Sequence, residues 1–285
     1  MNANYDVLDR NEDAILGDIQ IPPCPAILTK LLRETRADEP DFRRVSQLVG
    51  GDVALAISVL KLANSSFYGL PTKVASVQQA LVLLGLTTVT QLVTGLLLRQ
   101  AFSSAAGPSM ERYWKASMAM SLISALLCRE TARGDAGVAC TYGLFRDCGM
   151  PVMQQKFPIY ADIFDGSALI PGEPVLEIEN ERYATNHARV GAQLARSWHL
   201  PESLCFAIVY HHDVLYSDEV LNQAESGAVS LIAIGLAAEQ LYCSATGAAC
   251  REWALAGDWA LFELDLTQEK FADLLARVKA SINQL

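Results

Sequence analysis

The spacing of apolar residues constrains the fold of this chain more than any other feature. Apolar side chains recur three and four positions apart along nearly the whole sequence, as they do on one face of an α-helix. Ile27, Leu28, Leu31 and Leu32 show this pattern in the segment before Pro40. Sustained runs in which apolar and polar residues alternate, as in a β-strand, are missing. We therefore predict an all-α fold with almost no sheet.

Capping and turn residues divide the chain into separate helices. Asp41, Asp52, Ser76 and Asn186 stand at positions where a side-chain oxygen can accept hydrogen bonds from the first turn of a helix. The Ser-Ala-Gly-Pro stretch at 103–108 predicts a boundary between two parts of the chain. Beyond it, predicted helices span 109–131, 136–148, 151–164, 186–198, 201–212, 218–244 and 267–283.

Composition excludes several classes of protein. Hydrophobic residues make up 51% of the 285 residues and charged residues 19%, so the chain can bury a large core and is not a disordered one. With 22 Lys and Arg against 32 Asp and Glu, the net charge is −10, which disfavours nucleic acid as a direct ligand. Neither of the common glycine-rich phosphate-binding motifs occurs, which disfavours a nucleotide-driven motor or a dehydrogenase.

Cysteine usage and the N-terminal sequence indicate a cytoplasmic protein. The seven cysteines are odd in number and include no C-x-x-C pair, which fits a reducing compartment better than a disulfide framework or a zinc site. The first residues lack the basic and apolar regions of a secretory signal. Val74 to Leu98 carries no charge, but Ser, Thr and Gln residues interrupt it and Gly85 divides it. We predict two buried helices there and no contact with a membrane.

Three of the four histidines are placed where they could converge. His187 precedes Val190 and Leu194 by three and seven positions, which puts its imidazole on the apolar face of the predicted 186–198 helix. His211 and His212 are adjacent at the end of the next helix. Neutral imidazole is the commonest metal ligand in proteins, so these residues could form a metal site. The same spacing is also typical of histidines that are hydrogen-bonded within the core or at a helix end and bind no metal.

Several short motifs follow one another along the chain: Ile21-Pro22-Pro23-Cys24-Pro25, Leu62 to Gly69, Ser76 to Ala80, Tyr113-Trp114, Gly143 to Gly149, His187 to Gly191 and Tyr210-His211-His212. Their order resembles that of the HDOD family, the non-hydrolytic relatives of the HD phosphohydrolases. The resemblance covers about residues 15–215. It implies an HDOD domain over 15–215, with a front helical bundle at about 15–105 and an HD-like half at about 109–215. Residues 216–285 would be a helical extension packed on this domain.

One of these motifs forms the loop after Leu62, whose family residues are Asn64, Ser65, Phe67 and Tyr68. We expect a structural role for this loop: the two aromatic rings pack against the bundle, and Asn64 bonds to backbone near the helix end.

The chain departs from the HD phosphohydrolases at two metal-ligand positions. The His-Asp pair reads Arg146-Asp147, and the earlier histidine near Trp114 is replaced by Ala116, or by Lys115 if the alignment shifts by one. A guanidinium stays protonated and repels a divalent ion. The resemblance thus implies a remnant of the HD pocket, formed by Ala116, Arg146, Asp147, His187, His211 and His212. We expect no metal, no cofactor and no catalytic residue there.

The resemblance implies a non-enzymatic regulatory or output module of bacterial signal transduction that acts through contacts with signalling proteins. Two alternatives remain open. One is a degenerate, metal-dependent HD phosphohydrolase that uses Asp147, His187 and the His211-His212 pair. The other is a sensor whose former active site holds a cyclic dinucleotide or another anionic ligand against Arg146.

Overall fold

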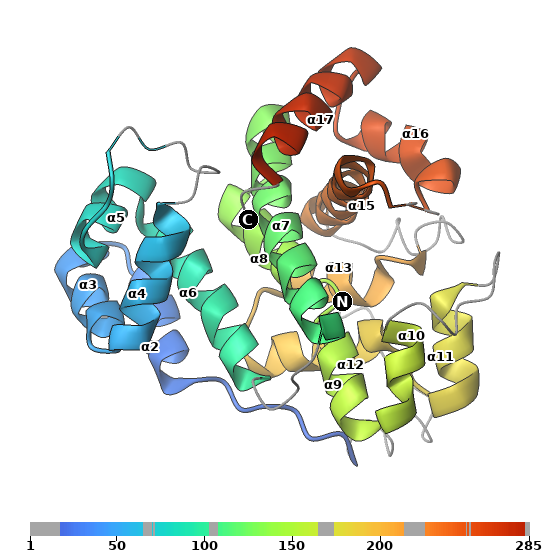
Figure 1. Cartoon of the computed structure of the whole chain (residues 1–285), viewed down its shortest axis with the longest axis horizontal. Helices are drawn as coiled ribbons and strands as arrows, with labels where there is room; N and C mark the ends of the chain where they lie inside the picture. The colour runs from blue at the N-terminus through green and yellow to red at the C-terminus, as the bar shows by residue number, and fades with distance from the viewer. Residues whose placement is uncertain are drawn as a thin grey trace, which may run out of the picture.

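The computed structural model describes residues 18–64, 70, 72–102, 108–164, 174–213, 226–248, 250 and 252–282. Within these ranges every regular element is a helix, which confirms the predicted all-α fold (Figure 1). The helices follow one another in three groups: a front bundle, a central group and a C-terminal group.

The front bundle lies at one end of the molecule (Figure 1, left). Val45 and Val49 of α3, together with Val59 of α4, are fully buried in its core. Its helices are α2 (Ala26–Thr35), α3 (Phe42–Gly50), α4 (Val53–Ala63), α5 (Val77–Leu84) and α6 (Leu86–Ala101). These bounds agree closely with the apolar pattern of the sequence.

The predicted capping residues account for the helix starts. The Asp41 carboxylate accepts the backbone N–H of Arg43 at 2.8 Å, and Asp52 accepts that of Leu55 at 3.0 Å. The Ser76 hydroxyl accepts the corresponding bond at the start of α5. These bonds satisfy N–H groups that have no partner inside the helix.

The uncharged stretch from Val74 to Leu98 forms two helices, α5 and α6, separated by Gly85 with a φ of +85°. A side chain rarely adopts that backbone conformation, so glycine suits this junction. Elsewhere in the described chain, Gly227–Thr246 is long and apolar enough to cross a membrane, but 61% of it is buried inside the fold. The pair α3 and α4 meets the same criteria only together, and it is bent by 114°. Core helices often have such composition, so this is weak evidence for a span.

The central group contains the long helix α7 (Pro108–Thr131) with α8 (Ala136–Phe145), α9 (Gly149–Lys156), α10 (Ala161–Phe164), α11 (Val175–Tyr183), α12 (His187–Ser197) and α13 (Glu202–Tyr210). The predicted 151–164 helix is divided, because a short 3-10 turn starts at Pro158 and proline cannot continue the hydrogen-bond ladder of α9. Helix α11 was not predicted, since its sequence VLEIENERY is largely polar.

The C-terminal group packs onto the central group. Its helices are α15 (Ser226–Thr246), α16 (Trp253–Glu263) and α17 (Gln268–Ile282). Helix α15 contacts α7, α8 and α13, and its Ile234 and Leu241 side chains are fully buried. Helix α16 was not predicted from the sequence. The C-terminal region therefore lies against the helices that carry the candidate site (Figure 1).

Candidate functional site

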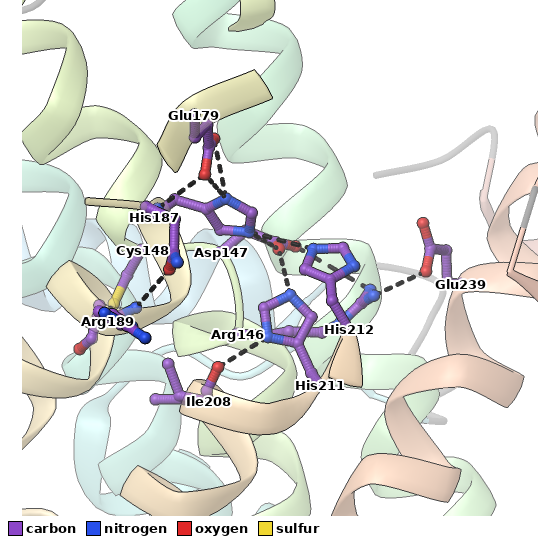
Figure 2. Close-up of polar contacts among 12 residues, drawn as sticks. Arg146, Asp147, Cys148, Glu179, His187, Arg189, Ile208, His211, His212 and Glu239 are labelled. Carbon is purple, nitrogen blue, oxygen red and sulfur yellow. Dashed lines mark hydrogen bonds and ion pairs between the residues drawn. The ribbon is translucent and has the colours of Figure 1, made fainter. Parts of the chain in front are cut away.

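Four side chains from three places in the central group converge on one point (Figure 2). Asp147 lies in the turn between α8 and α9, His187 is the first residue of α12, and His211 and His212 follow α13. One donor atom from each of the four lies within 4.8 Å of the others. These four residues are called the donor cluster below.

Local sequence explains why His187 comes so close to Asp147. Asn186 caps α12 by accepting the N–H of Arg189 at 3.0 Å, which fixes the start of the helix at His187. Gly149 lies against this start: a Cβ at Gly149 would overlap the carbonyl oxygen of His187. The glycine thus lets α9 and α12 approach more closely than any side chain would permit.

The outer nitrogen of each histidine in the cluster is bonded to an acceptor outside it. His187 Nδ1 lies 2.8 Å from the Glu179 carboxylate, His211 Nδ1 lies 2.7 Å from the carbonyl oxygen of Ile208, and His212 Nδ1 contacts Glu252 in a short bond. Outer acceptors of this kind set which ring nitrogen carries the proton. The three Nε2 atoms therefore face inward.

The inward-facing nitrogen and oxygen atoms lie close to one another. His187 Nε2 and His212 Nε2 are 3.2 Å apart, and His211 Nε2 lies 3.3 Å from Asp147 Oδ1. A neutral His211 that donates to Ile208 leaves its buried Nε2 lone pair facing a carboxylate oxygen, and this Nε2 has no hydrogen-bond partner. Two acceptors in contact are stabilised only by a cation between them, either a proton or a metal ion.

The two buried histidines differ in protonation state because their surroundings differ. Burial alone would lower the pKa of His187, but the flanking Glu179 and Asp147 carboxylates raise it to about 10. Burial, together with His212 and Arg146, lowers the pKa of His211 to about 3. In the metal-free protein His187 is thus an imidazolium and His211 is neutral at pH 7.

Arg146 adjoins the cluster and is buried, with 4% of its side chain exposed. Its guanidinium lies 2.8 Å from Glu239 on α15 (Figure 2). It also lies 3.7 Å from Glu252, just before α16, and 4.0 Å from Asp147. Asp147 thus lies within 4.0 Å of Arg146 and of the rings of His187 and His211. The closest partner of Arg146 is Glu239.

Of the six residues assigned to the remnant pocket, five contact one another: Arg146, Asp147, His187, His211 and His212. The sixth, Ala116, lies partly buried on α7 and offers no ligand atom. In the family motif loop, the amide of Asn64 exchanges two hydrogen bonds with the backbone of Val74, at 2.7 and 2.8 Å. This is the structural role expected of Asn64. Ser65, Phe67 and Tyr68 lie outside the described residues.

Three carboxylates of the site were not found from the sequence: Glu179, Glu239 and Glu252. Glu179 is fully buried and also accepts a hydrogen bond of 2.5 Å from the Tyr160 hydroxyl. Its neighbours in the sequence are mostly polar. Glu239 did carry a signal, because it is the only charged residue between Gly227 and Thr246. A lone charge in so apolar a helix requires a partner.

The donor cluster fits a transition-metal ion. Asp147, His187, His211 and His212 would hold it, and the unpartnered Nε2 of His211 and the outer acceptors of all three histidines suit that role. A bound ion of this type lowers the pKa of a water molecule and thereby supplies a nucleophile for hydrolysis. These are the four residues that the hydrolase alternative of the sequence analysis uses, and His211 and His212 both face inward.

Comparison with known proteins identifies the fold. The family model of the HDOD domain matches residues 21–214. A crystal structure of an HDOD domain protein of unknown function from Geobacter sulfurreducens covers 95% of this chain and 97% of its own, with a TM-score of 0.75 and 20% identity. A provisionally named phosphohydrolase from Shewanella amazonensis covers 95% and 98%, with a TM-score of 0.73 and 21% identity. At these identities the likeness shows the fold alone.

Further relatives are larger than the matched region. A provisionally named signal transduction protein from Marinobacter aquaeolei has a TM-score of 0.68 at 23% identity, over 99% of this chain and 61% of its own. An uncharacterized protein of Treponema pallidum is 25% identical over 205 residues, which are 70% of this chain and 39% of that protein. The uncharacterized protein YuxH of Bacillus subtilis is 29% identical over 116 residues, 41% of this chain and 28% of its own. The chain thus spans well under half the length of these two curated relatives.

Proposed function

The chain belongs to the HDOD domain family, and we propose that it is a non-enzymatic regulatory domain of bacterial signal transduction that acts through contacts with other proteins. The observation that carries this proposal is the burial of Arg146 and its contacts with carboxylates. Its buried guanidinium takes the place of a metal-ligating histidine and is held by Glu239 and Glu252. A fixed cation there disfavours a second cation, and hydrolysis by this fold needs metal-activated water.

The proposed contact surface is the front apolar face, defined here as five exposed apolar side chains on helices that pack against one another. Val82 is 75% exposed, Val53 71% and Ile57 61%, and the remaining two are Phe42 and Leu83. They belong to α3, α4 and α5, which contact each other pairwise. Single exposed apolar residues are common, but several on adjoining helices are typical of a surface that binds another protein. The name of a signal transduction protein of similar fold supports the proposed signalling role, without bearing on the surface used.

The nucleotide-sensor alternative is not favoured by the charges around Arg146. Glu239, Glu252 and Asp147 all lie within 4.0 Å of the guanidinium. A phosphate group would have to displace these carboxylates or approach them closely, and either costs free energy in a buried site.

A metal-dependent phosphohydrolase is the second candidate function, favoured by the donor cluster itself. Three imidazole nitrogens and one carboxylate oxygen face one another, and the Nε2 of His211 has no partner. This candidate and the first differ in which residues the function needs: the front apolar face in one, the donor cluster in the other.

Genetic complementation in the native cell tests which of these two sets of residues the function needs. The defect of a deletion strain is to be rescued with the wild-type gene or with one of three variants. Ile57→Glu changes the front apolar face, and His212→Ala changes the donor cluster. Leu255→Glu is the matched control, because Leu255 is 72% exposed on α16 and lies outside the face.

We expect rescue by Leu255→Glu and His212→Ala and loss of rescue by Ile57→Glu, with all purified variants folded by circular dichroism. Loss of rescue by His212→Ala alone overturns the regulatory proposal in favour of the hydrolase. The hydrolase is then checked directly: the purified wild type would contain about one equivalent of metal and hydrolyse phosphodiesters, and the His212→Ala variant would not.

A further inference from the structure

The helices that carry the front apolar face differ in charge from the chain as a whole. The chain has 32 Asp and Glu against 22 Lys and Arg. Helices α3, α4 and α5 contain Arg43, Arg44 and Lys61 but no acidic residue. The aspartates just before α3 and α4 accept backbone N–H groups at the helix starts, where the positive end of the helix dipole offsets their charge. The face thus lies on a cationic part of an acidic protein.

Two of the three cations lie beside the apolar side chains of the face. Val53, Ile57 and Lys61 follow one another at intervals of four residues on α4 and are all exposed, so they form one ridge along the helix. Arg43 is exposed and directly follows Phe42 at the start of α3. Neither Arg43 nor Lys61 has an ion pair with another described residue. Both charges are therefore available to a partner.

We propose that the front apolar face binds an amphipathic helix of a partner protein, one whose apolar stripe is bordered by Asp and Glu. This inference rests on the proposed function, which places the protein contact at this face, and it adds the chemistry of the partner. The apolar stripe would cover Val53, Ile57 and their neighbours on α5, and the acidic border would lie against Arg43 and Lys61.

A helix is the form of partner that this face fits. Side chains spaced four residues apart on α4 form a ridge that packs into the groove between the ridges of a second helix. The described part of the chain contains no strand, so it offers no sheet edge to which a partner could add a strand. Three cations are few for a surface that binds lipid headgroups or nucleic acid through charge. A protein helix is therefore favoured over these anionic surfaces.

The acidic border follows from the position of the two free cations. When the apolar side chains are covered, Arg43 and Lys61 come to the rim of the contact. Carboxylates opposite them speed up the encounter and select among partners, whereas cations opposite them repel. A helix with a basic border would thus be rejected even if its apolar stripe fitted.

The experiment selects binders from a phage library of helical peptides whose exposed positions are all random. The full chain is the target, after phage that bind the Ile57→Glu variant have been removed. We expect selected peptides with apolar residues at positions i, i+3 or i+4, and i+7, flanked by Asp and Glu. The library imposes neither feature, so their enrichment reports the preference of the face.

One selected peptide is then titrated by fluorescence anisotropy against the wild type and charge-reversed variants that are folded by circular dichroism. Arg43→Glu and Lys61→Glu should each weaken binding about tenfold. Lys30→Glu is the matched control, because Lys30 is exposed on α2, which carries no residue of the face. High salt should reduce the difference between the wild type and Lys61→Glu, since it screens charges at the rim.

Three results overturn the inference: selected peptides without an excess of acidic residues, equal affinity for the wild type, Arg43→Glu and Lys61→Glu, or a library without binders. In the last case the wild type and Ile57→Glu are sedimented with vesicles of equal parts phosphatidylcholine and phosphatidylglycerol. Sedimentation of the wild type alone would assign the face to a membrane surface. None of these peptide results contradicts protein contact at the face, which fails separately if Ile57→Glu rescues the deletion strain.

Discussion

The charge of His187 depends on the two carboxylates that flank it. Glu179 contacts Nδ1 at 2.8 Å, and Asp147 lies 3.6 Å from Nε2. Burial opposes a charged imidazole, yet the pKa of His187 is raised to about 10. The ordinary pKa of an unfolded histidine is about 6.5, so the folded state holds a proton that the unfolded state releases. This contribution to stability is complete below about pH 6.5 and is lost as the pH rises toward 10.

The Glu179→Gln variant tests this assignment in the metal-free protein. Because glutamine cannot balance the imidazolium, we expect the pKa of His187 to fall and the protein to lose about 3 kcal/mol of stability at pH 6. The fall in stability between pH 6.5 and 10 should also become shallower. Urea unfolding over this pH range measures both effects. Glu177→Gln, an exposed change on the same helix, is the control. An unchanged pH profile in Glu179→Gln would contradict the assignment.

A second prediction for single residues concerns the ion pair of Arg146 with Glu239. Arg146 is buried but Glu239 is partly exposed, so the carboxylate left by Arg146→Met is partly hydrated and we expect a loss of about 1–3 kcal/mol of stability. Adding Glu239→Gln should recover part of this loss, which a double-mutant cycle detects. The exposed Arg277–Glu130 pair, at 2.7 Å, is the control and should show a coupling below about 1 kcal/mol. Strict additivity in the Arg146–Glu239 cycle would show that the two charges are not coupled.

The sequence identified the four donors of the cluster, because histidines on apolar helix faces and beside an aspartate are recognisable without a structure. It did not identify Glu179, Glu239 or Glu252. These carboxylates come from three separate helical regions, and their roles depend on how α11, α15 and α16 pack around the donors. Packing between distant segments of the chain has no local signal, apart from the isolated charge of Glu239 in an apolar helix.

At the scale of elements, the close approach of α9 and α12 depends on Gly149. A Cβ there would overlap the His187 carbonyl oxygen and lie 2.7 Å from the backbone nitrogen of Gly191. We expect Gly149→Ala to destabilise the protein by about 1–3 kcal/mol or more, because the helices must separate. It should also shift the NMR signals of the cluster histidines. Gly50→Ala is the control, since nothing lies within 4 Å of its Cβ position, and it should be neutral or slightly stabilising. Equal effects of the two changes would contradict this account.

Helix starts were predicted better than helix ends and connections. Side-chain caps such as Asp41 and Asn186 act within three residues, so they can be read from local sequence. The division of 151–164 follows from Pro158, a local signal that the apolar pattern did not take into account, whereas the helix α16 depends on contacts with the rest of the fold. Helix α16 carries Trp253, whose ring stacks on Phe271 of α17 at 4.8 Å between centroids. An apolar segment that is stabilised by such distant contacts need not show a clear helical period of its own.

At the scale of the whole molecule, the three groups are joined by contacts far apart in sequence. The indole N–H of Trp198, after α12, donates to the carbonyl oxygen of Pro22 at 2.9 Å, and Arg36 of the front bundle donates to that of His199 at 3.2 Å. The family model ends at residue 214, yet the Geobacter structure matches 95% of this chain. The C-terminal helices are therefore part of a shared fold.

This arrangement predicts that residues 1–215 do not fold alone. Deleting 216–285 removes the fully buried Ile234 and Leu241 of α15 and also the carboxylates that neutralise buried Arg146. Exposed apolar surface and an unpaired buried cation both destabilise the folded state, so we expect no cooperative thermal transition. Deleting only 267–285 removes α17 and keeps α15 and both carboxylates; this control should unfold cooperatively at a lower temperature than the full chain. Differential scanning calorimetry of the full chain and the two truncated proteins measures whether each unfolds cooperatively and at what temperature. A cooperative transition of the 1–215 fragment near that of the full chain would show that the HDOD domain is complete without the C-terminal helices.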